Sequence, residues 1–304
     1  MRLLEPETTL PTLTTKSPLR PWLELARISN LPTVWTNTLA AWLLSGGSVT
    51  DLRLLWITLG ASLLYTGGMI LNDAADIAFD RQHRPERPIP SGRIALRWAW
   101  RVGLIFLLCG ASMMVGRGGA NPAVTITLAL TILAYDLYHK PWSGSVLLMG
   151  ACRTLLYLAA ASPLLANPWS GPALLPGLAL GAYIVGLSLI ARREAKPAST
   201  PKSPTWPLLL RLISPVLLTC YQSTIHQKVL PIALGIGLLL WINRTLRQMR
   251  TDPPRSIGPA VGKLLATIAW VDAAALAPTH PKTALTFIAL VPLLRLWQTK
   301  IAAT

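Results

Sequence analysis

Charged residues are scarce in this chain. Only 13% of its 304 residues are Asp, Glu, Lys or Arg, whereas soluble globular domains average roughly 25%. Acids are the rarest, with 12 Asp and Glu against 28 Lys and Arg, and hydrophobic residues make up 52% of the chain. This composition excludes an ordinary soluble domain and indicates an integral membrane protein.

Cysteine is also rare, and its placement gives no sign of a thiolate metal site. Cys109, Cys152 and Cys220 all lie inside apolar runs, and no C-x-x-C pair occurs. A free cysteine in such a setting behaves as a small hydrophobic residue. The sequence also has no P-loop. We therefore look for metal ligands among the few carboxylates instead.

The first residues of the chain are polar. The stretch 1–20 is rich in Thr and Pro and has no apolar run of the kind that a signal peptide needs. We expect residues 1–24 to be a disordered cytoplasmic tail. A single transmembrane domain is expected to follow at 25–304.

Ten apolar stretches approach the roughly 20 residues that a membrane-spanning helix needs. The last of them contains Pro292 and Arg295 and could lie in the membrane interface instead. We therefore predict an all-α polytopic transmembrane bundle of about nine helices. The stretches are 31–47, 53–72, 95–115, 122–138, 143–165, 172–191, 206–222, 228–243, 257–277 and 282–298.

The positive charge follows the membrane topology. Lys and Arg collect before the first stretch and after the second, fourth, sixth and eighth, while the intervening loops carry few. An excess of Lys and Arg is typical of loops on the cytoplasmic side of a membrane. Membrane topology therefore accounts for most of the net charge of +16, and a nucleic-acid partner is not needed to explain it. We expect a multi-pass protein of a bacterial inner membrane, with the N-terminus and the basic loops in the cytoplasm.

An acidic cluster ends the second stretch. The sequence "LNDAADIAFDRQHRPERPIPSGR" covers residues 71–93 and places three aspartates directly after an apolar run. If the helix continues, Asn72, Asp76 and Asp80 fall at i, i+4 and i+8 on one face, and Asp73 borders that face. Such carboxylates repel one another unless a cation lies between them. They could also be a solvated helix end neutralised by the neighbouring arginines.

The chemistry of these side chains favours a phosphate site. Magnesium takes oxygen ligands and usually combines one or two carboxylates with water and substrate phosphates. Arg84 and Arg87 follow within one loop, and their planar guanidinium groups suit phosphate oxygens. We predict a magnesium–diphosphate site at the membrane edge.

Three segments resemble the UbiA superfamily of membrane prenyltransferases. "NDAADIAFD…RPERPIPSG" is similar to its first aspartate-rich motif, "LARISNLPTVWTN" (25–37) to its first-helix entrance, and "AYDLYHKPWSG" (134–144) to its tyrosine-and-lysine loop. The resemblance implies a bundle around a central cavity, with a cytoplasmic cap of loops. It also implies transfer of a prenyl group from a Mg²⁺-bound prenyl diphosphate to a lipophilic or aromatic acceptor.

The resemblance, together with the residue chemistry, gives a candidate site. Arg153 is expected to face the cavity because a guanidinium inside an apolar span needs a partner. Arg27 and Lys140 could instead be membrane anchors, Asn37 a helix–helix contact, and Tyr135 an interface residue. The expected catalytic residues are Asp76, Asp80 and Arg153. The expected diphosphate-binding residues are Arg27, Asn37, Arg84, Arg87, Tyr135, Lys140, Arg192 and Arg193. The expected metal ligands are Asn72, Asp73, Asp76, Asp80 and Glu194.

One part of the family pattern is missing. The second motif, usually D-x-x-x-D, would fall in "SLIARREAKPAST" (188–200), where Glu194 is the only acid. Arg192 and Arg193 could bind phosphate directly or only anchor the helix. Asp136 and Asp252 could reach the same chamber. This "ARRE" variant resembles the divergent EboC-like branch.

The missing motif leaves a second function open. A catalytically reduced relative could bind or transport an isoprenoid or lipid-like metabolite without transferring it. The membrane alcohol-phosphatidyl transferases, which also place aspartates beside a span, are not favoured because their D-G-x-x-A-R pattern does not occur.

Overall fold

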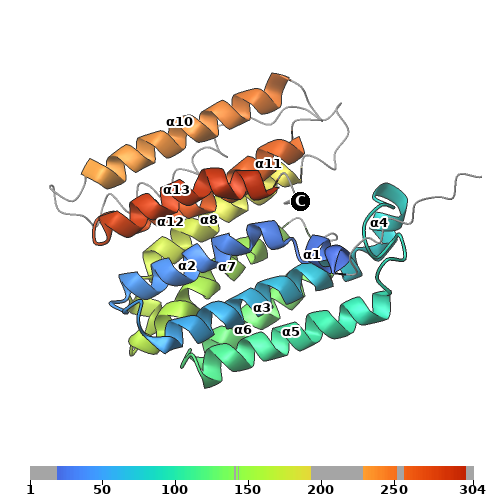
Figure 1. The fold of residues 1–304 in the computed structure, drawn as a ribbon, viewed down its shortest axis with the longest axis horizontal. Coiled ribbons are helices and arrows are strands. Elements are labelled where there is room, and N and C mark those ends of the chain that lie inside the picture. Colours follow the sequence, from blue (N-terminus) through green and yellow to red (C-terminus); the bar gives the residue numbers. More distant parts are fainter. Residues whose placement is uncertain (1–18, 140–141, 143, 193–228, 252–256, 299–304) are drawn as a thin grey trace, which may run out of the picture.

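The computed structural model describes residues 19–139, 142, 144–192, 229–251 and 257–298. Within these residues the chain is helical and contains no strand. The membrane-bundle helices lie side by side along a common direction (Figure 1). They are α2 (Leu31–Leu44), α3 (Leu52–Ala75), α5 (Leu96–Gly116), α6 (Pro122–Tyr138), α7 (Ser145–Ala161), α8 (Leu174–Ala191), α10 (Val229–Thr251), α11 (Ile257–Ala266), α12 (Ile268–Leu276) and α13 (Pro281–Gln298).

These helices confirm the predicted all-α membrane bundle. Six stretches of the described residues are long and apolar enough to cross a bilayer, and α6 is a shorter apolar helix. The predicted spans have helical counterparts, except that 206–222 lies outside the described residues. The span predicted at 257–277 is divided at Thr267 into α11 and α12.

Helix α2 lies at the centre of the bundle. It packs on α3, α7 and α12, and most of its residues are buried. Helices α3 and α5 pack together on one side, and α8, α12 and α13 lie on the other (Figure 1). Leu104, Ile105 and Leu108 of α5 are exposed, as expected for a helix that faces lipid.

Glycines bring α3 and α5 into close contact. A Cβ on Gly110 would lie 2.7 Å from the carbonyl oxygen of Gly60, and a Cβ on Gly67 would lie 2.8 Å from that of Gly103. Each helix therefore presents two glycines seven residues apart to the other. Lipid supplies no hydrophobic drive between helices, so such backbone contact is a main source of association.

A cap of short elements covers one end of the bundle (Figure 1). It consists of α1 (Arg20–Leu25), α4 (Ile77–His83) and the loop 84–95. Leu25, Ile89 and Ile94 from the cap form a buried cluster with Ile70 and Ala74 of α3. This cluster holds the cap against the end of α3, where the acidic residues lie.

The glycine contact predicts opposite outcomes for two alanine substitutions in α5. Gly110→Ala should destabilise the protein by about 1–3 kcal/mol because the new methyl group meets the backbone of α3. Gly116→Ala has open space around its Cβ and should be neutral or slightly stabilising, since alanine favours helix. Thermal unfolding in nanodiscs compares the two variants. Equal melting temperatures would contradict the packing argument.

Candidate active site

The acidic cluster (Asn72, Asp73, Asp76 and Asp80) spans the junction of α3 and α4. The regular helix is interrupted at Asp76, but hydrogen bonds from the Asp76 N–H to the Asn72 carbonyl and from the Asp80 N–H to the Asp76 carbonyl continue across the break. The predicted i, i+4, i+8 backbone connection is therefore present. The side chains nevertheless divide into two sets with different partners.

Asp73 and Asp80 form the first set and share one arginine. The Arg87 Nη1 donates to Asp73 Oδ1 at 3.2 Å and to Asp80 Oδ2 at 2.9 Å. The Arg27 Nη2 donates to the same Asp73 oxygen at 3.0 Å. Both carboxylates are buried. A single cationic nitrogen thus lies between two buried carboxylates.

Arg27 reaches Asp73 from an unusual backbone conformation. Its φ of +44° and ψ of +49° lie in the left-handed region, and among the described residues no other non-glycine residue has positive φ. Such strain costs of order 1 kcal/mol or more and marks functional sites. Burial lowers the pKa of the Arg27 guanidinium, but the Asp73 carboxylate, together with Tyr65 and Tyr135, outweighs burial, so the pKa is raised. Arg27 is therefore held as a cation beside the acidic cluster.

Asn72 and Asp76 form the second set and face α6. The Asn72 Nδ2 donates to Asp136 Oδ1 at 3.2 Å, and the His139 Nε2 lies 3.3 Å from Asp76 Oδ1. His139 also stacks on Tyr135, with 5.1 Å between ring centroids. The end of α6 therefore contributes an acid to the site, and its C-cap contributes a histidine.

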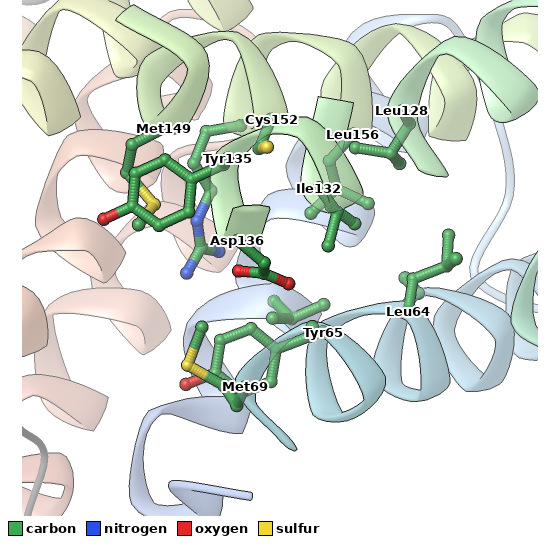
Figure 2. Close-up of a pocket in the computed structure, with 14 residues that line it drawn as sticks. Leu64, Tyr65, Met69, Leu128, Ile132, Tyr135, Asp136, Met149, Cys152 and Leu156 are labelled. Carbon is green, nitrogen blue, oxygen red and sulfur yellow. The ribbon is translucent and has the colours of Figure 1, made fainter. Parts of the chain in front are cut away.

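Asp136 has one oxygen that receives no hydrogen bond from the described residues. Its side chain is buried, and no described residue donates a hydrogen bond to Oδ2. Figure 2 shows the carboxylate pointing into the space between α6 and α3. A buried carboxylate oxygen without a donor is costly, so a proton or a cation is required there.

An apolar pocket begins beside these groups. It encloses about 570 Å³ of space not filled by atoms, part of which is open to the surroundings. Its polar groups are Tyr65, Tyr135, Asp136 and Arg153, and Figure 2 shows Tyr135 and Asp136 close to one another on its wall. The apolar lining comes from α2, α3, α6 and α7 and includes Val34, Leu64, Met69, Leu128, Ile132 and Leu156.

A chain of buried hydrogen bonds joins the pocket to α12. The Arg153 Nη1 donates to Asn37 Oδ1 at 2.6 Å, and the Asn37 Nδ2 donates to Asp272 Oδ2 at 2.7 Å. The Tyr157 hydroxyl donates to the other Asp272 oxygen. We call these four residues the relay. It places Arg153 in the pocket, as expected, and uses both polar atoms of the Asn37 amide.

The remaining predicted residues lie around this centre or outside the described residues. Arg84 directly follows α4 as its C-cap, and no ion pair joins its side chain to a described residue. Arg192 donates to the carbonyl of His139 at 3.1 Å and to the Ser145 hydroxyl, and so ties the end of α8 to the segment between α6 and α7. Three predicted residues are not described: Lys140, Arg193 and Glu194.

The donor set fits a divalent cation in combination with a substrate. Among the described residues, no three His, Cys, Asp or Glu side chains converge closely enough to hold a metal by themselves. Magnesium needs only one or two carboxylates when phosphate and water complete its shell. Arg87 Nη1 lies between Asp73 and Asp80, where positive charge is required. Asp136 Oδ2, to which no described residue donates, is a second place, and a cation or a proton would satisfy it.

Comparison with known proteins identifies the family. A model of the UbiA prenyltransferase family matches residues 32–268. This chain belongs to that family. The match confirms the resemblance seen in the sequence and, with the helical fold, an integral membrane protein. It does not test the EboC-like branch, which stays a prediction.

Two curated relatives show the range of family members that the chain is similar to. It is 33% identical to a digeranylgeranylglyceryl phosphate synthase of Methanothrix thermoacetophila over 127 residues. This match covers 41% of this chain and 48% of that protein. The chain is 28% identical over 141 residues to a 4-hydroxybenzoate octaprenyltransferase of Paracidovorax citrulli, covering 44% and 48%. The chain thus spans about half the length of the curated relatives it matches.

Two solved structures share the fold. One, reported for digeranylgeranylglyceryl phosphate synthase in membranes, has a TM-score of 0.59 at 18% identity and covers 90% of this chain and 100% of that chain. The other is a UbiA homolog from Archaeoglobus fulgidus bound to GPP and Mg²⁺. Its TM-score is 0.55 at 14% identity, covering 84% and 99%.

Several site residues escaped the sequence analysis. Asp136 was considered only as an acid able to reach the chamber, and His139 was not singled out. Asp272 and Tyr157 were also missed. The signal for Asp272 was present, since it is an acid inside an apolar span, the same feature that singled out Arg153.

Arg87→Gln tests whether a cation belongs between Asp73 and Asp80. Without Mg²⁺ this variant should lose about 3 kcal/mol of stability, because two buried carboxylates lose their shared cation. Added Mg²⁺ should raise its melting temperature more than that of the wild type. Arg93→Gln is the control, since Arg93 pairs with the partly exposed Glu24 in the same cap. An equal response of Arg87→Gln and wild type to Mg²⁺ would exclude a metal at this position.

Proposed function

We propose that this chain is an integral membrane prenyltransferase that moves a prenyl group from a prenyl diphosphate to a lipophilic or aromatic acceptor. The observation that carries the proposal is the position of the acidic cluster and its two arginines at the end of an apolar pocket. The charged end suits a diphosphate and the pocket suits a prenyl chain. The curated relatives that the chain resembles include a digeranylgeranylglyceryl phosphate synthase and a 4-hydroxybenzoate octaprenyltransferase, which supports a prenyl substrate.

In the first step, two arginines change their hydrogen-bond partners from carboxylates to the diphosphate. Arg27 and Arg87 are held by Asp73 and Asp80 in the absence of substrate. A diphosphate offers them stronger, bidentate oxygen partners. Arg84 could bind it in the same way, since no described residue pairs with its guanidinium. Mg²⁺, when bound, would neutralise the diphosphate and help it to leave. The acidic cluster would hold that ion, with Asp136 taking the part of the missing second motif.

Departure of the diphosphate is the chemical step. The bond between the prenyl C1 and the diphosphate oxygen breaks, and its electron pair stays on the oxygen. The arginines stabilise the charge that develops there. The apolar pocket keeps water away from the allylic cation. The acceptor then bonds to C1 and loses a proton.

The basic loops support an orientation in the membrane. The cap and the ends of α3, α6 and α8 carry most of the charged residues near the site, and this supports our proposal that the diphosphate end faces the cytoplasm. A bacterial inner membrane remains our expectation for the location. Glu194, Arg193 and Lys140 remain predicted contributors to the same end.

Substrate titration tests the function directly. We expect purified protein in nanodiscs to bind geranyl, farnesyl or geranylgeranyl diphosphate in a Mg²⁺-dependent way and to transfer the prenyl group to an added acceptor. The double variant Asp76→Ala, Asp80→Ala should lose the Mg²⁺-dependent binding, whereas Asp51→Asn at the opposite end of α3 should keep it. Tight binding that ignores both Mg²⁺ and the double variant would favour the rival function, a binding or transport protein.

The variant Asp136→Asn tests whether Asp136 takes the place of the missing second aspartate motif. Asparagine has the same shape and can still accept the hydrogen bond from Asn72, but it cannot serve as an anionic ligand. With Mg²⁺ present, affinity for the prenyl diphosphate should fall at least about tenfold. Without Mg²⁺ it should equal that of wild type. Cys152→Ala, in the same pocket, is the control, and an unchanged Mg²⁺ dependence in Asp136→Asn would refute this assignment.

A further inference from the structure

The end of α6 is held by hydrogen bonds from side chains. The carbonyl group of its C-cap residue, His139, accepts from the Ser145 hydroxyl at 2.9 Å and from the Arg192 Nη2 at 3.1 Å. The Arg192 Nη2 also donates to the Ser145 hydroxyl and, at 3.4 Å, to the Trp142 carbonyl. We call Ser145 and Arg192 the clasp. The last carbonyl groups of a helix lack partners inside it and carry partial negative charge, so a cation suits this position.

The clasp belongs to a closely packed pair of helices. Ser145 begins α7, and Arg192 is the C-cap of α8. The two helices are in backbone contact, since a Cβ on Gly150 would lie 2.6 Å from the carbonyl oxygen of Gly181. The Thr154 hydroxyl adds a hydrogen bond of 2.9 Å to the backbone of α8. The clasp therefore fixes the end of α6 to a unit whose two helices cannot separate without losing backbone contact.

The anchored end of α6 carries the groups that face the acidic cluster. His139 lies opposite Asp76, and Asp136 lies opposite Asn72. The His139 Nδ1 donates to the Asp136 carbonyl at 3.2 Å, because a carbonyl can only accept. The imidazole and the carboxylate thus belong to the same helical turn whose last carbonyl the clasp holds. A shift of this turn would move both groups away from α3.

The bonds of the clasp differ from those expected of a substrate contact. The Ser145 side chain is fully buried, so its hydroxyl serves the protein and not a ligand. The Arg192 Nη2 is directed at oxygens of His139, Trp142 and Ser145. A phosphate ligand at this nitrogen would have to displace three protein oxygens at once. The clasp is therefore built to hold the backbone at the end of α6.

We infer that Arg192 is a positioning residue, which with Ser145 holds the end of α6 so that Asp136 and His139 face the acidic cluster. This role differs from the direct phosphate contact that the sequence predicts for Arg192. The inference rests on the proposed function only for the purpose of the positioned groups, a Mg²⁺–diphosphate site. Arg192 lies in the segment where the second aspartate motif would fall, and there it supports the site through the backbone of α6.

Binding of geranylgeranyl diphosphate in nanodiscs separates positioning from direct contact. With Mg²⁺ present, Arg192→Gln should lower the affinity about tenfold, as loss of a supporting hydrogen bond does at metal sites. Ser145→Ala should act in the same direction, and the double variant should resemble Arg192→Gln alone because the two residues act as a unit. Without Mg²⁺ all three variants should bind as wild type does, since Arg27 and Arg87 are unchanged.

Amide hydrogen exchange tests the clasp without any substrate. Arg192→Gln and Ser145→Ala should each raise exchange in a peptide covering residues 135–147, because the end of α6 opens more often. A peptide from α5 should exchange as in wild type, which reports correct folding. Thr154→Ala is the control, since it removes a hydrogen bond between α7 and α8 and none to α6. It should leave exchange at 135–147 and the Mg²⁺-dependent affinity unchanged.

The outcomes distinguish this inference from the proposed function. An equal loss of affinity with and without Mg²⁺ in Arg192→Gln, with Ser145→Ala unchanged, would overturn the clasp and make Arg192 a direct phosphate ligand. Unchanged exchange at 135–147 in both variants would also overturn it. The predicted exchange pattern in a protein that binds no prenyl diphosphate would support the clasp and refute the proposed function. Mg²⁺-dependent prenyl transfer that neither variant affects would do the reverse.

Discussion

Charge balance at the edge of the membrane is the constraint on which this structure depends. Buried carboxylates are costly unless a cation is close, and here Asp73 and Asp80 share one nitrogen of Arg87. Arg27 adopts a left-handed backbone to add a second cation. The cap that carries Arg87 is in turn held on α3 by a small apolar cluster. Packing and charge therefore support one another at this end of the bundle.

The same arrangement explains how a site can be stable before its substrate arrives. The arginines neutralise the acids in the free protein, and under the proposed function the arginines would turn to the diphosphate and the acids to the metal. The relay is arranged differently, since its acid, Asp272, and its base, Arg153, are joined through the neutral amide of Asn37.

The sequence predicted the spans and the acidic cluster well because both rest on local patterns. Twenty apolar residues define a span wherever they lie, and the spacing from Asn72 to Asp80 needs only helix geometry. It could not predict that Asp80 joins Asp73 through Arg87 while Asp76 joins His139, because these choices depend on how α6 and the cap pack on α3. The relay was harder still, since Asn37, Arg153 and Asp272 are brought together from three distant helices. Only the presence of polar residues inside apolar spans indicated it.

The most direct test of the account is electron paramagnetic resonance of Mn²⁺ in place of Mg²⁺, with a non-ionising geranylgeranyl thiolodiphosphate in nanodiscs. We predict that Mn²⁺ binds together with the analogue and shows hyperfine coupling to its phosphorus atoms. The coupling should vanish in the Asp76→Ala, Asp80→Ala double variant. Analogue binding without phosphorus-coupled Mn²⁺, or a coupling unchanged in that variant, would contradict a metal–diphosphate site built on the acidic cluster.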